Sequence, residues 1–161
     1  MSILIIDDDP DKRRYIASML MKDNPEYKIS ECDNFQDAVT FIDTNSQCID
    51  LIVLDWCFPI RQDRNCVNGM GGQVLGHMAS NGQTNKVIIC SSDFVEIDKD
   101  EYPFVLGSIV FFPCIQIDEE INKLLNPPVE PQDKGPCLKR KKPQQNTDYK
   151  RRLSSQPWWQ K

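Results

Sequence analysis

The chain has 161 residues, a length typical of one domain, and its hydrophobic content of 40% is sufficient for a single core. Residues 1–126 carry 10 Lys and Arg against 21 Asp and Glu, a net charge of −11, whereas residues 127–161 carry 9 against 3, a net charge of +6. The acidic body argues against nucleic-acid binding by residues 1–126, and the lack of an apolar stretch of ~18 residues argues against a membrane span.

The chain begins with an apolar run, Ile3 to Ile6, that stops at three consecutive aspartates. Such a run is typical of a strand that is buried on both faces in a parallel sheet. Pro10 favours the first turn of a helix, and apolar residues at helical spacing extend that helix to about Asp23. A second strand is expected over residues 27–32.

The middle of the chain repeats this alternation. Asp33-Asn34 resembles a helix cap, and the apolar pattern that follows it predicts a helix over residues 35–42. A strand is predicted over residues 49–54 and ends at Asp55. A polar stretch with several glycines then separates this strand from a helix over residues 73–80.

The last part of the body completes the pattern. A strand over residues 87–90 ends at Ser91, and residues 94–106 show no clear helical period. A fifth strand is predicted over residues 109–112 and a last helix over residues 117–125. Strands that alternate with helices at this spacing predict an α/β fold, a five-stranded parallel sheet with helices on both faces.

Three of these strands end in polar residues that parallel pairing would bring to one edge of the sheet. Asp7 and Asp8 follow the first strand, Asp55 the third and Ser91 the fourth. Crowded carboxylates repel one another unless a cation lies between them, and oxygen ligands suit Mg²⁺. A metal beside Asp55 would also help that carboxylate to attack a phosphoryl group. The alternative is that these acids only cap helices and line solvated loops.

The chain resembles the receiver domains of response regulators in three segments, Leu4–Arg14, Leu51–Pro59 and Val87–Ser92. The order and the spacing of these segments match that family over roughly residues 2–126. The resemblance implies a flavodoxin-like receiver fold for residues 1–126, which we treat as a receiver-like domain.

The resemblance also implies a role for each residue of the site. Asp55 stands where the family accepts a phosphoryl group, and Ser91 where a hydroxyl binds the phosphoryl oxygens. Asp7, Asp8 and Asp55 match the residues that bind Mg²⁺, and the backbone carbonyl of Cys57 matches the position that completes the metal's ligands.

Two departures from the family pattern bear on phosphorylation. Phe112 stands where the family has a lysine that pairs with the aspartate or phosphate, and a phenyl ring offers no charge-assisted hydrogen bond. Ile109 stands where many members carry a mobile aromatic residue. Between Pro59 and the third predicted helix, residues 60–71 form a longer segment than the family usually has. Either Arg61 or Arg64 in it would supply the missing cation, or the segment is a solvated insertion without a role.

Residues 127–161 have a different composition, rich in Pro, Lys, Gln and Ser, that is typical of a disordered tail. Lys139–Lys142 and Lys150–Arg152 are basic clusters able to meet nucleic-acid phosphates, an acidic partner or the acidic body. Trp158 and Trp159 are candidate partner-binding residues, because tryptophan is enriched among interface hot spots.

The cysteines and the first residues bear on the compartment. The seven cysteines are odd in number and form no Cys-x-x-Cys pair, and the first residues lack the pattern of a signal peptide. We therefore expect reduced thiols and a cytoplasmic location.

Three functions remain open at this point. The first, favoured because of Phe112, is an atypical receiver that acts as a signalling adaptor through protein contacts, without efficient phosphotransfer. The second is a single-domain response regulator phosphorylated on Asp55 by a histidine kinase, and the third is a nucleic-acid-associated regulator that binds through its tail. We expect no small-molecule substrate and no enzyme: hydrolases with an aspartate nucleophile usually carry a second acid two residues on, and here Trp56-Cys57 follows.

Overall fold

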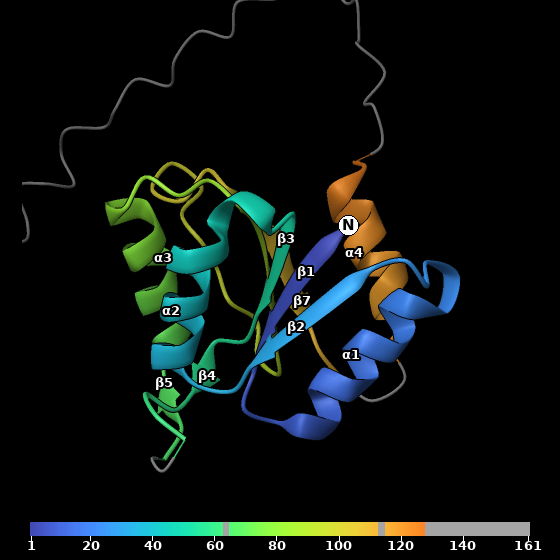
Figure 1. Ribbon diagram of the computed structural model, residues 1–161, viewed down its shortest axis with the longest axis horizontal. Coiled ribbons are helices and arrows are strands. Elements are labelled where there is room, and N and C mark those ends of the chain that lie inside the picture. Colours follow the sequence, from blue (N-terminus) through green and yellow to red (C-terminus); the bar gives the residue numbers. More distant parts are fainter. Residues whose placement is uncertain (63–64, 113–114, 128–161) are drawn as a thin grey trace, which may run out of the picture. The chain divides into compact units, whose positions relative to one another are not determined.

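The computed structural model describes residues 1–62, 65–112 and 115–127. Its centre is a five-stranded, fully parallel sheet in the order β2-β1-β3-β6-β7 (Figure 1). The predicted fold class is therefore confirmed. The strands of this sheet are β1 (Ser2–Ile6), β2 (Lys28–Cys32), β3 (Leu51–Leu54), β6 (Lys86–Ser91) and β7 (Val105–Val110).

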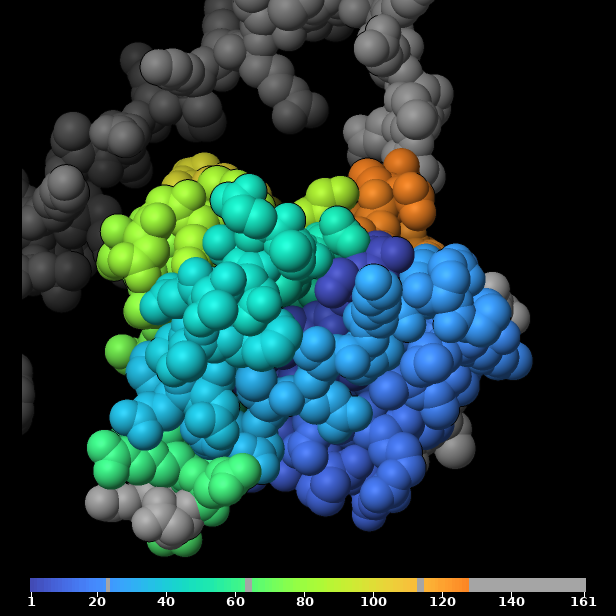
Figure 2. Space-filling view, viewed as in Figure 1, coloured from blue at the N-terminus to red at the C-terminus, as the bar shows by residue number. Residues whose placement is uncertain are grey.

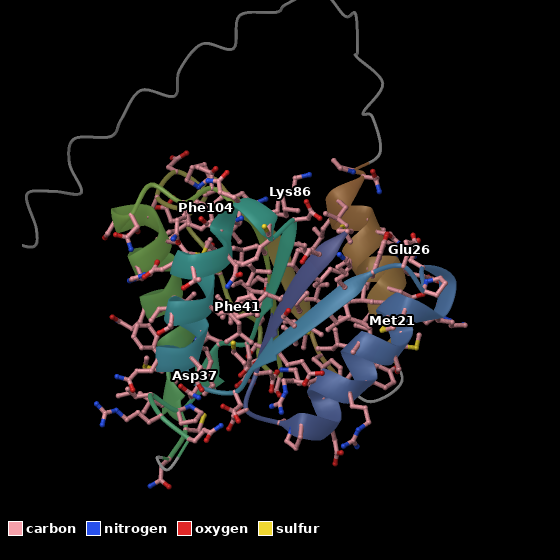
Figure 3. The ribbon with its side chains drawn as sticks, viewed as in Figure 1. Met21, Glu26, Asp37, Phe41, Lys86 and Phe104 are labelled. Carbon is pink, nitrogen blue, oxygen red and sulfur yellow. The ribbon has the colours of Figure 1, made fainter. Side chains whose placement is uncertain are left out.

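Helices cover both faces of the sheet (Figure 1). One face packs against α1 and α4, and the other packs against α2 and α3. Figure 3 shows the side chains between the layers, with Phe41 of α2 directed toward the sheet. The helices are α1 (Pro10–Asp23), α2 (Phe35–Asn45), α3 (Met70–Ser80) and α4 (Ile117–Leu125), with the short 3-10 helix η1 (Ser46–Cys48) after α2.

The central strands are apolar because both of their faces are covered. Ile3 and Ile5 of β1 belong to the core on the side of α1 and α4, whereas Leu4 and Ile6 belong to the core on the side of α2 and α3. These four side chains are at most 1% exposed. A continuous apolar run thus fills two cores at once, as expected for a strand in the middle of a parallel sheet.

Short polar residues fix where the first two helices begin. The Asp9 carboxylate accepts hydrogen bonds from the backbone N–H groups of Asp11 and Lys12, at 2.9 and 3.3 Å, and so caps α1. The Asn34 side chain accepts from the N–H of Asp37 at 3.0 Å and caps α2, which confirms the predicted cap. The cap on α1 places Lys12 in the first helical turn, directly after the carboxyl end of β1.

The fifth parallel strand corrects the prediction from sequence. It was expected over residues 109–112, but β7 runs from Val105 to Val110. Gly107 interrupts the apolar pattern because a Cβ atom there would lie 2.7 Å from a methyl carbon of Leu124. The close packing of α4 on β7 therefore requires glycine at this position, and the glycine interrupts the apolar run by which the strand could be predicted. Phe111 and Phe112 follow the strand instead of ending it.

The connection from β6 to β7 contains no helix over residues 92–104. Tyr102 and Phe104 pack against the core on the side of α2 and α3, with their rings in an edge-to-face arrangement at 6.1 Å. Phe94 is 74% exposed. The segment therefore replaces a covering helix with single aromatic anchors and leaves one large apolar side chain in solvent.

A small antiparallel hairpin pairs β4 (Cys57–Phe58), just before the segment expected to be an insertion over residues 60–71, with β5 (Val67–Asn68) inside that segment. Its start is attached to α2, since the N–H groups of Phe35 and Gln36 donate to the carbonyls of Pro59 and Ile60. Figure 2 shows this segment, in green, at a corner of the molecule beside α2. Among the described helices, none has both the length and the hydropathy required to cross a membrane.

Candidate phosphoryl and metal site

Three parallel strands deliver the predicted polar residues to one edge of the sheet. Asp7 follows β1, Asp55 follows β3 and Ser91 ends β6. Their exposed fractions are only 3%, 6% and 5%. The backbone extends the sheet pairing to Asp55, because its N–H donates to the carbonyl of Ile6 at 2.8 Å. The sheet register therefore sets the position of Asp55 relative to Asp7.

Asp7, Asp8 and Asp55 form a cluster in which one carboxylate oxygen of each lies within 4.8 Å of the others. Asp7 and Asp55 are buried, and Asp8 is exposed. The donors are all hard oxygen atoms, as Mg²⁺ prefers, and sulfur and imidazole ligands are absent from the cluster. The chemistry of these donors fits a hard divalent cation.

A cation that the sequence did not predict lies inside the cluster. The Lys12 ammonium contacts Asp7 Oδ2 at 2.6 Å and Asp55 Oδ1 at 2.8 Å, and it donates to the carbonyl of Cys90 at 2.8 Å. Lys12 as a whole is only 7% exposed. All three donor directions of the ammonium are used, which is the condition under which a buried lysine charge is tolerated.

Burial and neighbouring charges shift the pKa values of Asp7, Asp8 and Lys12. Burial raises the pKa of Asp7 from 3.8 to about 6, and the charge of Asp55 adds to the rise while Lys12 opposes it. Burial also raises the pKa of Asp8. The pKa of Lys12 is raised because Asp7 and Asp55 outweigh the desolvation that lowers it. Two buried carboxylates share one ammonium, so negative charge is in excess.

The hairpin after β3 holds the second oxygen of the candidate phosphoacceptor. The N–H of Cys57 donates to Asp55 Oδ2 at 2.9 Å, and the Cys57 thiol donates to Asn68 Oδ1 at 3.1 Å across the hairpin. The N–H of Gly71, at the start of α3, donates to the carbonyl of Trp56 at 3.2 Å. The residues just after Asp55 are therefore fixed by both the hairpin and α3.

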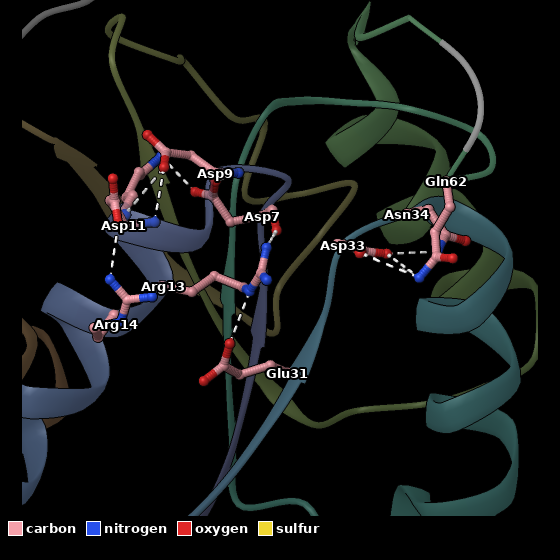
Figure 4. Close-up of polar contacts among 10 residues, drawn as sticks. Asp7, Asp9, Asp11, Arg13, Arg14, Glu31, Asp33, Asn34 and Gln62 are labelled. Atoms are coloured by element: carbon pink, nitrogen blue, oxygen red, sulfur yellow. Dashed lines mark hydrogen bonds and ion pairs between the residues drawn. The ribbon is translucent and has the colours of Figure 1, made fainter.

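The other basic residues near the site have different partners. Arg13 donates to the Asp7 carbonyl at 2.7 Å and to Glu31 at 2.8 Å, so it bridges the end of β1 to β2 (Figure 4). Arg61 is exposed, and Arg64 lies outside the described residues. A cation supplied by residues 60–71 therefore stays a prediction, whereas the ammonium of Lys12 in α1 does contact Asp55. Figure 4 shows that Gln62 of this segment reaches the carboxylate of Asp33, at 3.3 Å.

Two aromatic residues follow β7 near the site. Phe112, which replaces the expected lysine, is 53% exposed. The Phe111 ring instead faces the site, with its centroid 5.2 Å from Lys12 Nζ and 5.8 Å from the ring of Tyr15. Ile109 is 5% exposed and belongs to the core on the side of α1 and α4. An aromatic face near an ammonium stabilises its charge.

The sequence analysis missed Lys12 as a site residue, although the signal was present. A helix that begins at Pro10, three residues after Asp7, places its third residue close to the strand end. A lysine side chain is long enough to return from there to the edge of the sheet. The candidate partner-binding residues Trp158 and Trp159 and the basic clusters lie outside the described residues and stay predictions.

Comparison with known proteins gives a consistent result. The family model of the response regulator receiver domain matches residues 3–102. The two-component response regulator EHD1 of Oryza sativa subsp. indica is 33% identical over 94 residues, which cover 55% of this chain and 26% of that protein. The two-component response regulator ORR30 of subsp. japonica matches equally well. This chain therefore spans about a quarter of the length of these curated relatives.

Solved structures match the fold. The response regulator TrrA of Thermotoga maritima, in complex with Mg²⁺ and BeF, aligns with a TM-score of 0.58 and 21% identity over 76% of this chain and 97% of that chain. The receiver domain of a Luxo repressor protein from Vibrio parahaemolyticus aligns with a TM-score of 0.57 and 21% identity over 77% and 87%. A complex of TrrA with the histidine kinase ThkA aligns with a TM-score of 0.55 and 21% identity over 77% and 97%.

Proposed function

Because the chain belongs to the response regulator receiver family, we propose that its receiver domain accepts a phosphoryl group on Asp55 and transmits the change to a protein partner. The observation that carries this proposal is the arrangement of Asp55, 6% exposed, beside Asp7 and Asp8 at the carboxyl edge of the sheet. Ser91 ends the neighbouring strand β6 and offers a hydroxyl for the phosphoryl oxygens.

This proposal differs from the function that the sequence alone favoured. The adaptor interpretation relied on the loss of a cation at Phe112. In the structure Asp55 does have an ammonium on one oxygen and a backbone N–H on the other, from Lys12 and Cys57. The premise against phosphotransfer is therefore weaker than the sequence suggested.

Asp7, Asp8 and Asp55 are the residues that would hold Mg²⁺, with the Cys57 carbonyl as a further ligand. When bound, the metal supplies positive charge for the phosphoryl oxygens. The two buried carboxylates, with the exposed Asp8, leave the cluster two negative charges after Lys12 is counted, so a divalent cation would neutralise it. The fit of charge and of donor type supports the magnesium proposal.

The reaction itself is a simple displacement. An oxygen of the Asp55 carboxylate attacks phosphorus, a new P–O bond forms, and the bond from phosphorus to the leaving group breaks with its electron pair. With acetyl phosphate as donor, the leaving group is acetate, and no proton is transferred. With a histidine kinase as donor, the leaving group is the neutral imidazole of a phosphohistidine that is protonated on its other ring nitrogen, and that proton stays on the ring. TrrA, a structural relative, forms a complex with a histidine kinase, and a kinase of that kind is the donor that we propose.

The first test is phosphoryl incorporation. Incubation with acetyl phosphate and Mg²⁺ is expected to add one phosphoryl mass to the intact protein, and Asp55→Asn is expected to abolish the addition. Asp100→Asn, which changes an exposed aspartate in the irregular segment before β7, is the matched control and is expected to behave as the wild type. Incorporation that persists in Asp55→Asn would show that another residue reacts.

A second prediction concerns pH and the metal. Mg²⁺ must compete with the proton on Asp7, whose pKa is about 6. Ionised Asp7 binds the metal and protonated Asp7 does not, so affinity falls as pH falls through 6. We expect binding at pH 5 to be about tenfold weaker than at pH 7.5, because most Asp7 is then protonated. Isothermal titration calorimetry at both pH values measures this difference, and equal affinities would contradict it.

A specific observation keeps the adaptor function as a second candidate. Phe94, Val110 and Phe112 are 74%, 37% and 53% exposed; Phe94 lies in the segment before β7, Val110 ends β7 and Phe112 follows it. Exposed apolar side chains of this size favour protein binding. If no phosphoryl group is incorporated by the wild type, the protein would act through such contacts alone. The proposal of nucleic-acid binding concerns residues 127–161, which lie outside the described residues, and it stays a prediction.

A further inference from the structure

The two described residues directly after β7, Phe111 and Phe112, do not provide the charge that phosphoryl transfer to Asp55 requires. Phe112 stands in the sequence position of the family's lysine, and its ring is 53% exposed. Phe111 faces the site but offers only an aromatic ring, 5.2 Å from Lys12 Nζ. A phenyl ring cannot donate a charge-assisted hydrogen bond to a phosphoryl oxygen.

We propose that Lys12, in the first turn of α1, is the catalytic cation of this receiver and takes over the task of a lysine after the fifth parallel strand. The proposal rests on the proposed phosphorylation of Asp55. It follows from the contacts of the Lys12 ammonium, which lies 2.8 Å from Asp55 Oδ1, 2.6 Å from Asp7 Oδ2 and 2.8 Å from the Cys90 carbonyl.

The position of this ammonium is built into the fold. The Asp9 cap fixes the backbone of Lys12 at the start of α1, with its N–H 3.3 Å from Asp9 Oδ1. The residue is 7% exposed, and the Phe111 ring lies on one side of its charged end. The ammonium also donates to the carbonyl of Cys90, the residue before Ser91 at the end of β6. Lys12 therefore reaches both the attacking carboxylate and the strand end that would meet the phosphoryl group.

No other described basic residue has this combination of contacts. Arg13 is used by the Asp7 carbonyl and Glu31, and Arg14 pairs with Asp11 in solvent, where the two side chains are 77% and 84% exposed. Arg61 is exposed. Among residues 1–62, 65–112 and 115–127, Lys12 is thus the basic residue whose charged group contacts Asp55.

The chemical role of Lys12 follows from the charges in the reaction. The Asp55 carboxylate and the phosphoryl group are both negative and repel each other. During the displacement, the P–O bond to Asp55 forms while the bond to the leaving group breaks, and the transferred group keeps its negative oxygens throughout. Lys12 stays protonated. Its ammonium offsets the repulsion first at Asp55 and then at the phosphoryl oxygens, which is electrostatic stabilisation by a preorganised donor.

The test compares five proteins under identical conditions, namely the wild type, Lys12→Met, Lys12→Arg, Phe112→Lys and the control Arg14→Met. Initial rates of phosphoryl incorporation from acetyl phosphate at saturating Mg²⁺ are measured by intact mass. Lys12→Met keeps an unbranched side chain without charge and is expected to be about 100-fold slower, the loss typical of removing one such donor. Lys12→Arg is expected to retain about a tenth of the wild-type rate, since it keeps the charge with a different shape. Arg14→Met is expected to match the wild type.

A second measurement does not depend on turnover. Binding of beryllofluoride with Mg²⁺, followed by fluorine NMR, is expected to weaken about 100-fold in Lys12→Met, and Lys12→Arg is expected to restore part of it. Circular dichroism of each variant in the assay buffer verifies that it is folded. If Lys12→Met cannot be kept folded, the comparison of Lys12→Arg with Arg14→Met decides, because only the former is expected to change rate or binding.

The outcomes separate this proposal from the proposed function. A wild-type rate in Lys12→Met, with phosphoryl on Asp55, would overturn the role of Lys12 and leave phosphorylation intact. No incorporation in the wild type and in the variant Phe112→Lys would overturn both. Incorporation in Phe112→Lys but not in the wild type would overturn the role of Lys12, because its ammonium would then not support the reaction. Incorporation in Lys12→Met but not in the wild type would also overturn it, because the ammonium would then block the reaction.

Discussion

Lys12→Met is expected to lower the free energy of unfolding by about 3 kcal/mol at pH 8 without Mg²⁺, as is typical when one partner of a buried ion pair is removed. The ammonium that is lost neutralises Asp7 and Asp55 at 2.6 and 2.8 Å, in a region where all three residues are at most 7% exposed. The two carboxylates would then face each other without a cation. Urea denaturation followed by circular dichroism measures the loss.

The direction of the pH dependence follows from the pKa of Asp7. Its folded-state pKa of about 6 lies above the usual 3.8, so the ionised carboxylate lowers the free energy of unfolding at pH 8. At pH 5 most of Asp7 is the neutral acid. The Lys12 charge is present at both pH values, because its pKa is raised above 10.5. The variant is therefore expected to lose much less stability at pH 5. Added Mg²⁺ should restore stability at pH 8, because it supplies the missing positive charge.

Arg14→Met is the matched control for this experiment. Arg14 lies on the same helix and pairs with Asp11 at 2.8 Å, but both side chains are exposed. Exposed pairs of this kind contribute little to stability. A loss in Arg14→Met as large as in Lys12→Met, or a loss that does not depend on pH, would contradict the account of the buried cluster.

Gly71→Ala is expected to lower the free energy of unfolding by about 1–3 kcal/mol, the range typical of overpacking. A Cβ atom on Gly71 would lie 2.7 Å from the carbonyl oxygen of Asp55 and 2.8 Å from a ring carbon of Trp56. The backbone of Asp55 cannot move away easily, because its N–H is bonded to Ile6 and its carboxylate to Lys12. The substitution should therefore also slow phosphoryl incorporation.

Gly76→Ala provides the control in the same helix. A Cβ atom at Gly76 would have no atom within 4 Å, so the helix would only gain propensity. We expect a gain of about 0.5–1 kcal/mol and an unchanged rate of incorporation. Thermal or urea denaturation of both variants measures the contrast. Two variants of equal stability would show that the contact of α3 with the residues after β3 has no energetic weight.

Much of the fold was predictable because it depends on local sequence patterns, namely apolar runs and helix-capping residues. The buried strands β1, β3 and β6 are apolar runs that end in polar residues, and α1 and α2 begin at the capping side chains of Asp9 and Asn34. β7 was misplaced because Gly107 is required by the contact with Leu124 of α4, a contact between elements that no apolar run records. The hairpin of β4 and β5 was missed because strands of two residues are too short for a period.

The candidate site was predictable for the same reason, but only in part. Asp7, Asp55 and Ser91 stand at strand ends, so the parallel sheet alone brings them together. Lys12 comes from a helix, and its approach depends on the Asp9 cap and on the Cys90 carbonyl. Comparison with the family pattern, position by position, detects that Phe112 replaces a lysine. It does not detect that a lysine of another element, Lys12 of α1, contacts Asp55.

The structure of the complex with Mg²⁺ and beryllofluoride tests the central claim most directly. The account predicts beryllium bound to an Asp55 oxygen, with the Lys12 ammonium within hydrogen-bond distance of Asp55 or of a fluoride. A complex in which Lys12 points into solvent, while the fluorides are held by another cation or by none, would contradict it.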